Sequence, residues 1–412
     1  MTGAPISAFP DVGLTTGPAI LTSDVAFVNE VQRNTYTIPR FMTGKQASDM
    51  LQGGETIRDD IYFDLKSSYT HYLPNQSFSY NNPQVLTQWS VAWRFTKAEA
   101  TWTAQEIGLN ANQLNSKARH HRFKKLLNAK IMNLMTDLSE GFEVDMWRVP
   151  SSTSMEAATG SVPYSIPTFV TEYDPLNTSL SAGGLSTTAR RPSDGTTALT
   201  TVQGIDPQAA DTNGKWANQL TTYAGNADLG VQAYNLFAAL TRQWRQLKFA
   251  RMPKGPEYSD PNTQPNALFC SLDGITLFED GLRRSQDLFV MAGRQDPSFS
   301  GPMFRGMAVE YLEELDSAAL YPTTSASGTG AALAEDASAG GFISGPRFYM
   351  LNLLYMLMCW HSDRYFHRIT PFQPDAQPMT TIMMVDCWHN LVCRSRRRQG
   401  LITPRGTAVT TV

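Results

Sequence analysis

Three residues near the end of the sequence, His361, Asp363 and His367, are of types that ligate metal ions. Zinc sites in proteins are built from three or four strong ligands, and no third imidazole or thiolate follows at ligand spacing. Because the three residues lie inside an aromatic run, we interpret them as hydrogen-bonded structural groups. His120 and His121 are neighbours in the chain, and neighbours on a helix face different directions, so they do not form a ligand pair either.

Enzyme motifs are missing from the sequence. It has no GxSxG nucleophile turn, P-loop, HExxH helix or GxGxxG turn, and the nearest glycine cluster, Gly328-Thr329-Gly330, lacks the third glycine. We therefore predict no catalytic residues, no bound metal and no cofactor.

One basic run stands out, and its arginines are Arg394, Arg396, Arg397, Arg398 and Arg405. In one interpretation Arg396, Arg397 and Arg398 contact phosphates, or carboxylates of a neighbouring subunit such as those of Glu140 and Glu143. In the other, the run is the solvated end of the last strand. Both interpretations stay open at this point.

The element that would position most charged candidates is a long helix predicted for residues 115–147. Its apolar residues recur every three or four positions, at Phe123, Leu126, Leu127, Ile131, Leu134, Met135, Leu138 and Phe142. This spacing is typical of an amphipathic helix, and Pro150 ends it. At 1.5 Å per residue it would be about 50 Å long.

The charges on this helix are reversed with respect to its dipole. Basic residues, including Arg119, Arg122 and Lys124, occupy the first half, and acidic residues, including Glu140 and Glu143, occupy the second half. Such charges are either solvated or matched by an oppositely charged partner in this subunit or a neighbour. We name these five residues as candidate inter-subunit contacts.

An aromatic hairpin is predicted before the helix, between residues 55 and 112. Trp89, Val91, Trp93 and Phe95 alternate with small or polar residues, Ala98, Ala100 and Trp102 continue the strand, and residues 57–72 supply its partner. A two-stranded ribbon is marginal alone and an aromatic face requires a covering surface, so Trp89, Trp93 and Phe95 are candidate inter-subunit contacts.

Other segments follow from the same patterns. Residues 1–54 form an extended arm that is too polar to fold alone, and residues 151–226 form loops around short strands such as 164–166 and 168–170. We predict helices over 228–251 and after Asp273, which would cap the second one. Strands are predicted over 267–270, 307–312 and 380–393, and 348–360 is a strand or short helix.

Composition limits the function classes. The chain has 412 residues, of which 42% are hydrophobic and 17% charged, and its net charge is −3. It is long enough for more than one lobe, and so small a charge gives no general attraction to nucleic acid or anionic membranes. Four irregularly spaced cysteines, no basic leader and no long apolar run predict a chain kept in a reducing cytoplasm without a membrane span.

The order of these elements resembles the major capsid proteins of tailed bacteriophages. The sequence is also similar to one subgroup in short phrases: Trp93-Arg94-Phe95 leading into Trp102, Phe123-Lys124-Lys125-Leu126, Met146-Trp147-Arg148-Val149-Pro150 and the run from Asp386 to Cys393. The resemblance covers nearly the whole chain, and 151–226 fits it least.

The resemblance implies an α+β phage major-capsid fold in five contiguous segments. These are an N-terminal arm (1–54), an E-loop hairpin (55–112), a P-domain with the long helix (113–226), an A-domain (227–345) and a return segment with the final strand and tail (346–412).

The resemblance also implies the function, which is self-assembly into pentamers and hexamers of an icosahedral virion shell around double-stranded DNA, formed in the cytoplasm of a host bacterium. Implied partners are further copies, a portal, decoration proteins, the DNA by weak non-specific contact, and a separate scaffolding protein or none. Some relatives crosslink an E-loop lysine to an asparagine; Lys66 is the lysine in that place, and no partner matches it. The alternatives are an encapsulin-type compartment and, less favoured, an enzyme with an unrecognised site.

Overall fold

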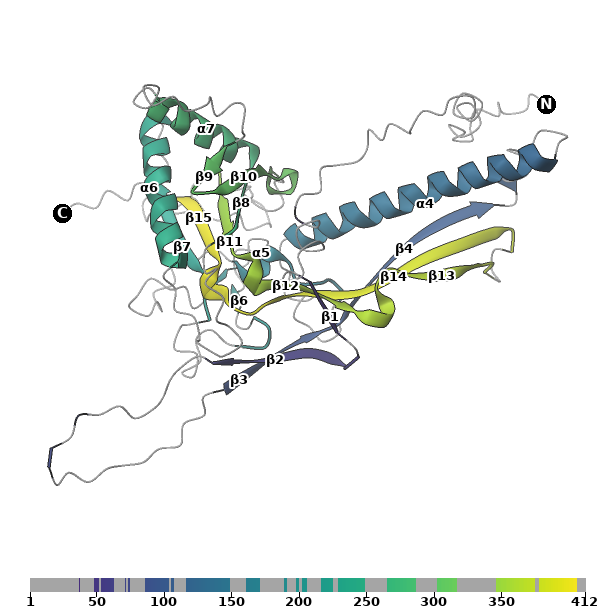
Figure 1. Ribbon diagram of the computed structural model, residues 1–412, viewed down its shortest axis with the longest axis horizontal. Helices are drawn as coiled ribbons and strands as arrows, with labels where there is room; N and C mark the ends of the chain where they lie inside the picture. The colour runs from purple at the N-terminus through teal and green to yellow at the C-terminus, as the bar shows by residue number, and fades with distance from the viewer. Residues whose placement is uncertain are drawn as a thin grey trace, which may run out of the picture. The chain divides into compact units, whose positions relative to one another are not determined.

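The computed structural model describes residues 37, 48–51, 53–62, 71, 73–74, 86–103, 105–106, 116–148, 161–170, 189–190, 198–199, 202–205, 216–224, 229–248, 265–286, 302–316, 346–374 and 378–405. It contains helices and sheets, in agreement with the α+β prediction (Figure 1). The chain divides into two compact units. The described parts of unit 1 lie within 95–143 and 361–388, and those of unit 2 within 36–94, 144–360 and 389–412.

Unit 1 contains most of the long helix α4 (Ser116–Trp147), together with strands β4 (Arg94–Thr103), β13 (His367–Phe372) and the first part of β14 (Thr380–Cys393). The helix confirms the prediction for 115–147 almost to the residue. Three residues of the predicted apolar stripe, Leu134, Leu138 and Phe142, are buried as expected at 2–4% exposure, while Ile131 and Met135 are half-buried. No acidic residue lies in its first turn and no basic residue in its last, so the reversed charge order is present in the folded helix.

The sheet of unit 1 is antiparallel between β13 and β14. Ile369 lies opposite Met384 and Phe372 opposite Ile382, with an irregularity between the two pairs. Strand β4 also pairs with β14. Alternate residues of β14, Met383, Val385 and Cys387, are buried, and so are Ala98, Ala100 and Trp102 of β4. Each strand therefore turns one face inward.

The predicted strand over Trp89–Trp102 is two strands rather than one. Strand β3 (Leu86–Ala92) ends before Trp93, and β4 begins after it. Buried residues have odd numbers up to Trp93 and even numbers from Arg94 onward, which leaves Phe95 62% exposed. The one-residue break changes the face that each side chain occupies, so Phe95 does not share a buried face with Trp89.

Strand β3 pairs antiparallel with β2 (Thr56–Tyr62) in unit 2, as the hairpin prediction requires. The register joins Ile57 to Val91 and Asp59 to Trp89. Of the residues between the two strands, 71, 73 and 74 are described.

A six-stranded sheet dominates unit 2, in the order β7-β15-β11-β8-β10-β9. Its strands are β7 (Gln219–Ala224), β15 (Gly400–Arg405), β11 (Phe348–Leu351), β8 (Ala267–Cys270), β10 (Met307–Tyr311) and β9 (Met303–Phe304). Helices α6 (Leu229–Lys248) and α7 (Leu272–Gln286) pack against each other and enclose a core with the sheet, in which Leu240, Phe278, Phe348 and Ile402 are fully buried (Figure 1).

Glycine is required where α6 approaches β15. A Cβ atom on Gly400 would collide with the Gln243 side chain and lie 3.0 Å from Leu247 Cδ1. Gln243 also donates to the Gln219 carbonyl (3.1 Å), which ties the helix to β7.

Smaller elements complete unit 2. Strand β12 (Met356–His361) pairs with residues 389–393 of β14 and with β1 (Ser48–Leu51), and β5 (Ala189–Arg190) pairs with β6 (Ala198–Leu199). Residues 353–355, 313–316 and 396–398 form the 3₁₀ turns η5, η4 and η7 of unit 2, and residues 362–364 form η6 of unit 1.

Three predicted elements differ from the structure. Residues 166–169 form a buried helical turn, α5, rather than a strand, because the Ser165 backbone N–H donates to the Thr168 hydroxyl (3.3 Å) and Pro167 suits a first helical turn. Asp273 does not cap α7, since Ser271 accepts the Gly274 N–H at 3.3 Å and the helix already includes Leu272.

The third difference is at the end of the chain. Strand β14 occupies 380–393 as predicted, but it is not the last strand. Residues 400–405, which we assigned to a tail, form β15 in the interior of the six-stranded sheet, where Leu401 and Ile402 are completely buried.

Candidate inter-subunit site

The two tryptophans at the base of the hairpin are packed inside their own subunit. Trp89 is 2% exposed and Trp93 is 6% exposed, and Trp93 Nε1 donates to the Gly54 carbonyl at 2.9 Å. Asp59 on β2 pairs with Arg394 at 3.4 Å. These contacts anchor the hairpin base, so the predicted inter-subunit role of Trp89 and Trp93 is not supported: their rings are already covered.

Among the aromatic side chains of the hairpin region whose burial the structure describes, Phe95 remains accessible. Its ring meets Trp388 of β14 edge to face, with centroids 4.8 Å apart. Arg364 lies over Trp388 at 5.4 Å and pairs with Asp386 (3.6 Å), and Trp388 Nε1 donates to the same carboxylate at 3.1 Å. This cluster on unit 1 offers an aromatic edge beside a guanidinium, a combination enriched at protein interfaces.

His361, the first residue of the histidine group, makes a capping hydrogen bond. His361 Nδ1 accepts the backbone N–H of Asp363 at 3.2 Å, which caps η6. Among the residues that the structure describes, no three histidine, cysteine, aspartate or glutamate side chains are grouped as a metal site. The side chains of His120 and His121 lie outside the described residues.

Two arginines of the basic run, Arg396 and Arg398, are internal, which corrects both interpretations for these two residues, while the inter-subunit role of Arg397 stays a prediction. Arg396 is 2% exposed; its Nε donates to the Phe169 carbonyl at 2.9 Å and its Nη1 to the Trp216 carbonyl at 3.0 Å. Arg398 is 1% exposed and lies over the Tyr355 ring at 5.1 Å, where burial lowers the pKa of its guanidinium. These two arginines join segments of their own chain, and Arg397 between them is half-buried.

The charged residues of α4 that we predicted as inter-subunit contacts differ in how far they are buried. Glu143 is 1% exposed and so is not available to another subunit, while Glu140 is half-buried and its inter-subunit role stays a prediction. The side chains of Arg119, Arg122 and Lys124, and Lys66 entirely, lie outside the described residues.

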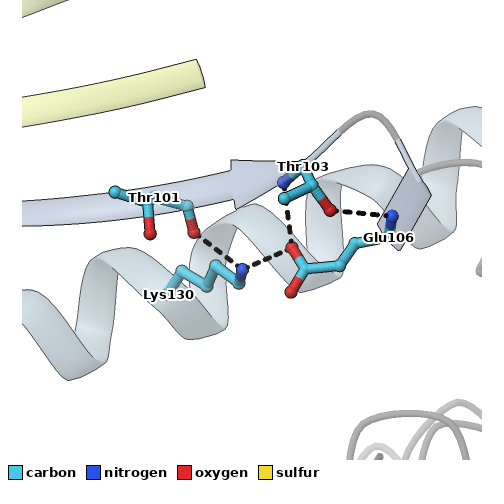
Figure 2. A network of polar contacts seen from close by, with 4 residues as sticks. All are labelled: Thr101, Thr103, Glu106 and Lys130. Atoms are coloured by element: carbon cyan, nitrogen blue, oxygen red, sulfur yellow. Dashed lines mark hydrogen bonds and ion pairs between the residues drawn. The ribbon is translucent and has the colours of Figure 1, made fainter. Parts of the chain in front are cut away.

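A polar network that we did not predict joins β4 to α4 in unit 1 (Figure 2). The Glu106 backbone N–H donates to Thr103 Oγ1 and the Thr103 N–H donates to Glu106 Oε2, both at 3.2 Å, which is the reciprocal pattern of a capping box. Lys130 Nζ then donates to Glu106 Oε2 (2.7 Å) and to the Thr101 carbonyl (2.8 Å). The Thr-x-x-Glu spacing is the sequence signal that could have indicated it.

The four cysteines are free and buried, as expected for reduced thiols. Burial raises the pKa of Cys387 to about 11 and that of Cys393 to about 12, so both are uncharged thiols at neutral pH. No helix in the described part of the chain is long and apolar enough to cross a membrane.

Comparison with known proteins gives a structural match and no sequence match. No protein-family model and no curated protein matches the sequence. The chain is similar to a solved structure described as the cyanophage A-1(L) capsid asymmetric unit, at TM-score 0.54 and 12% identity over 94% of this chain and 98% of that one.

Two further similarities are weaker. The mature capsid of bacteriophage PhiM1 has TM-score 0.45 and 11% identity over 95% of this chain and 91% of that one. The holo-SrpI encapsulin complex from Synechococcus elongatus has TM-score 0.40 and 10% identity over 94% of each chain.

The agreement with the cyanophage capsid chain extends over nearly the full length of both chains, although little sequence is shared. It confirms the fold predicted from the resemblance. The protein therefore has the major-capsid fold of tailed phages.

Proposed function

We propose that the protein is the major capsid protein of a tailed bacteriophage, which assembles into hexamers and pentamers of an icosahedral shell around double-stranded DNA. The observation that carries this proposal is the shared fold with a capsid chain over 94% of the residues. Portal, decoration and scaffolding proteins would be further partners.

Features of the subunit support association rather than catalysis. A two-stranded ribbon is marginal alone, and the base of the β2–β3 hairpin is tied to unit 2 by Trp93 and by the Asp59–Arg394 pair. We propose that this hairpin is the E-loop and that its distal part lies on a neighbouring subunit.

On unit 1, exposed Phe95 beside Trp388 and Arg364 is an accessible candidate contact. A buried aromatic anchor with an adjacent arginine commonly carries much of the affinity of an interface. Phe95→Ala should leave the subunit folded, because the ring is 62% exposed, and should reduce particle yield.

The decisive experiment is electron microscopy of the protein expressed alone and together with the neighbouring genes. Closed shells or curved sheets of hexamers and pentamers are expected. Monomers or small oligomers under both conditions would contradict the proposal. Nuclease-protected DNA in particles made during infection is expected of a phage shell, whereas enclosed protein without DNA would indicate an encapsulin-type compartment.

A further inference from the structure

The exposed face of α6 in unit 2 carries a row of positive charge. Arg242, Arg245 and Lys248 recur every three residues, which keeps them near one side of the helix and about 4.5 Å apart along its axis. Arg242 and Arg245 are exposed, and no ion pair between described residues includes either of them. We call these three residues the α6 basic row, and its two arginines are available to an anionic partner.

A fourth cation reaches the same place from a different element. Arg305 belongs to the two-residue β9–β10 turn, in which it and Gly306 both have positive φ (49° and 87°). Its guanidinium lies 4.4 Å from the centre of the Trp244 ring, and Lys248 Nζ lies 4.7 Å from the same centre. Because Trp244 packs against the buried core, its ring holds both cations in place, and less side-chain entropy is lost when they bind an anion.

The side chains around the row favour nucleic acid over a protein surface. None of the large exposed hydrophobic residues in the described part of the chain lies on α6, whereas protein interfaces are usually centred on apolar anchors from which charge is depleted. Interfaces with nucleic acid are more polar and more positive. Thr241 and Gln246 line a shallow groove with the two arginines, and hydroxyl and amide groups of this kind also bind phosphate oxygens.

We propose that the α6 basic row and Arg305 contact the phosphates of double-stranded DNA, so that this face of unit 2 is turned toward the interior of the shell. The inference rests on the proposed function and deepens it by naming the residues that meet the enclosed DNA. Duplex DNA carries one negative charge for about every 1.7 Å of its axis, so successive cations on one helix can each lie near a phosphate. The net charge of −3 for the whole chain restricts such contact to a local row of this kind.

The salt dependence of DNA binding tests the row. A protein that neutralises Z phosphates loses affinity with a slope of about −0.9Z when log K is plotted against log salt concentration. Four cations give a slope of about −3.6, so the affinity of dispersed subunits for a short labelled duplex should fall about 150-fold between about 50 and 200 mM salt. Arg242→Ala combined with Arg245→Ala should leave a slope of about −1.8 and a fall of about 12-fold. Fluorescence anisotropy of the duplex measures both.

Two further double variants separate these two positions from charge in general. Arg58→Ala combined with Arg368→Ala removes two exposed arginines from other elements and changes the net charge equally, so its slope should stay at about −3.6. Arg242→Lys combined with Arg245→Lys should also keep the slope, because a lysine ammonium binds phosphate as a point charge. Duplexes of unrelated sequence should bind within about threefold of one another, since phosphate contacts carry no sequence information.

Particles of the double alanine variant at Arg242 and Arg245 should form in normal yield, because the row contacts DNA and not another subunit. Equal slopes for this variant and the unaltered chain, or no duplex binding at the lowest salt concentration, would overturn the inference. A reduced particle yield with an unchanged slope would assign the row to a neighbouring protein subunit instead. If the unaltered protein forms no particles, the proposed function fails, and with it the assignment of this face to a shell interior, even where the slopes show that the row binds DNA.

Discussion

Replacing Arg396 removes a connection between three segments of unit 2. Its guanidinium donates to the carbonyls of Phe169 and Trp216, residues 227 and 180 positions away in the chain. Arg396→Met keeps most of the side-chain volume and deletes both donors. The two buried carbonyls then have no donor at this place.

The expected destabilisation is large for a single residue. A buried acceptor left without its hydrogen bond costs about 1–3 kcal/mol, so two carbonyls should cost about 2–6 kcal/mol in free energy of unfolding. Domains typically have only about 5–15 kcal/mol in total. The free energy of unfolding of Arg396→Lys should lie between those of the unaltered protein and Arg396→Met. The lysine ammonium group is a point donor and does not reproduce the guanidinium fork, which donates in two directions.

Urea denaturation of dispersed subunits, followed by tryptophan fluorescence, measures the effect, and Trp216 beside Arg396 makes the signal local. Arg397→Met in the same turn is the control. Its side chain is half-buried and its Nε has no hydrogen-bond partner among the described residues, so the substitution should change stability by at most about 0.5 kcal/mol. Equal midpoints for Arg396→Met and Arg397→Met would refute the assignment of Arg396 as an internal connector.

Three further perturbations follow from contacts in the two units. Glu106→Gln keeps a capping side chain but removes the charge facing Lys130 (2.7 Å). Because both side chains are partly exposed, thermal melting should show a loss of about 0.5–1 kcal/mol in free energy of unfolding, and this loss should shrink at high salt. Gly400→Ala places a Cβ against Gln243 and Leu247 and should cost about 1–3 kcal/mol, measured by urea denaturation. Burial lowers the pKa of His389 to about 3, so the unfolded chain binds a proton below about pH 6.5 while the folded chain does not. Stability is therefore complete above that pH and should fall by up to about 1.4 kcal/mol per pH unit as acid is added toward pH 3.

Each of these three has its own control. Glu106→Ala should cost more than Glu106→Gln because it also removes the cap. Gly141→Ala, on α4 with open space around its Cβ, should stabilise by about 0.5–1 kcal/mol. His389→Gln should flatten the acid dependence below pH 6.5, and an unchanged slope would mean that other groups cause it.

Elements with a strong repeating pattern were predictable from the sequence. Helix α4 and strand β14 agree with the predictions to within a residue, because an apolar stripe or an alternating run marks one buried face over many positions. The phage-capsid resemblance gave the fold class, which the cyanophage comparison confirms. The five predicted contiguous domains stay a prediction beside two units that are discontinuous in sequence.

What could not be predicted depended on partners far away in the chain. A run of arginines at the end of a strand has the composition of a solvated surface, and only the folded chain reveals the carbonyls that Arg396 meets. The parity change after Trp93 is one residue long, which is too short to mark a strand break. The segment 166–169 has β-forming residues, and its cap contacts with Ser165 and Thr168 outweigh that preference.

Strand β15 has a consequence for the order of events after translation. It follows the other five strands of its sheet in sequence, yet it lies between β7 and β11, parallel to the first and antiparallel to the second. This inner strand is therefore synthesised after the other five, and β7 and β11 lack their shared neighbour until then. A chain interrupted before residue 400 lacks the strand that pairs with both β7 and β11. The six-stranded sheet is therefore completed only in a chain whose synthesis has included β15.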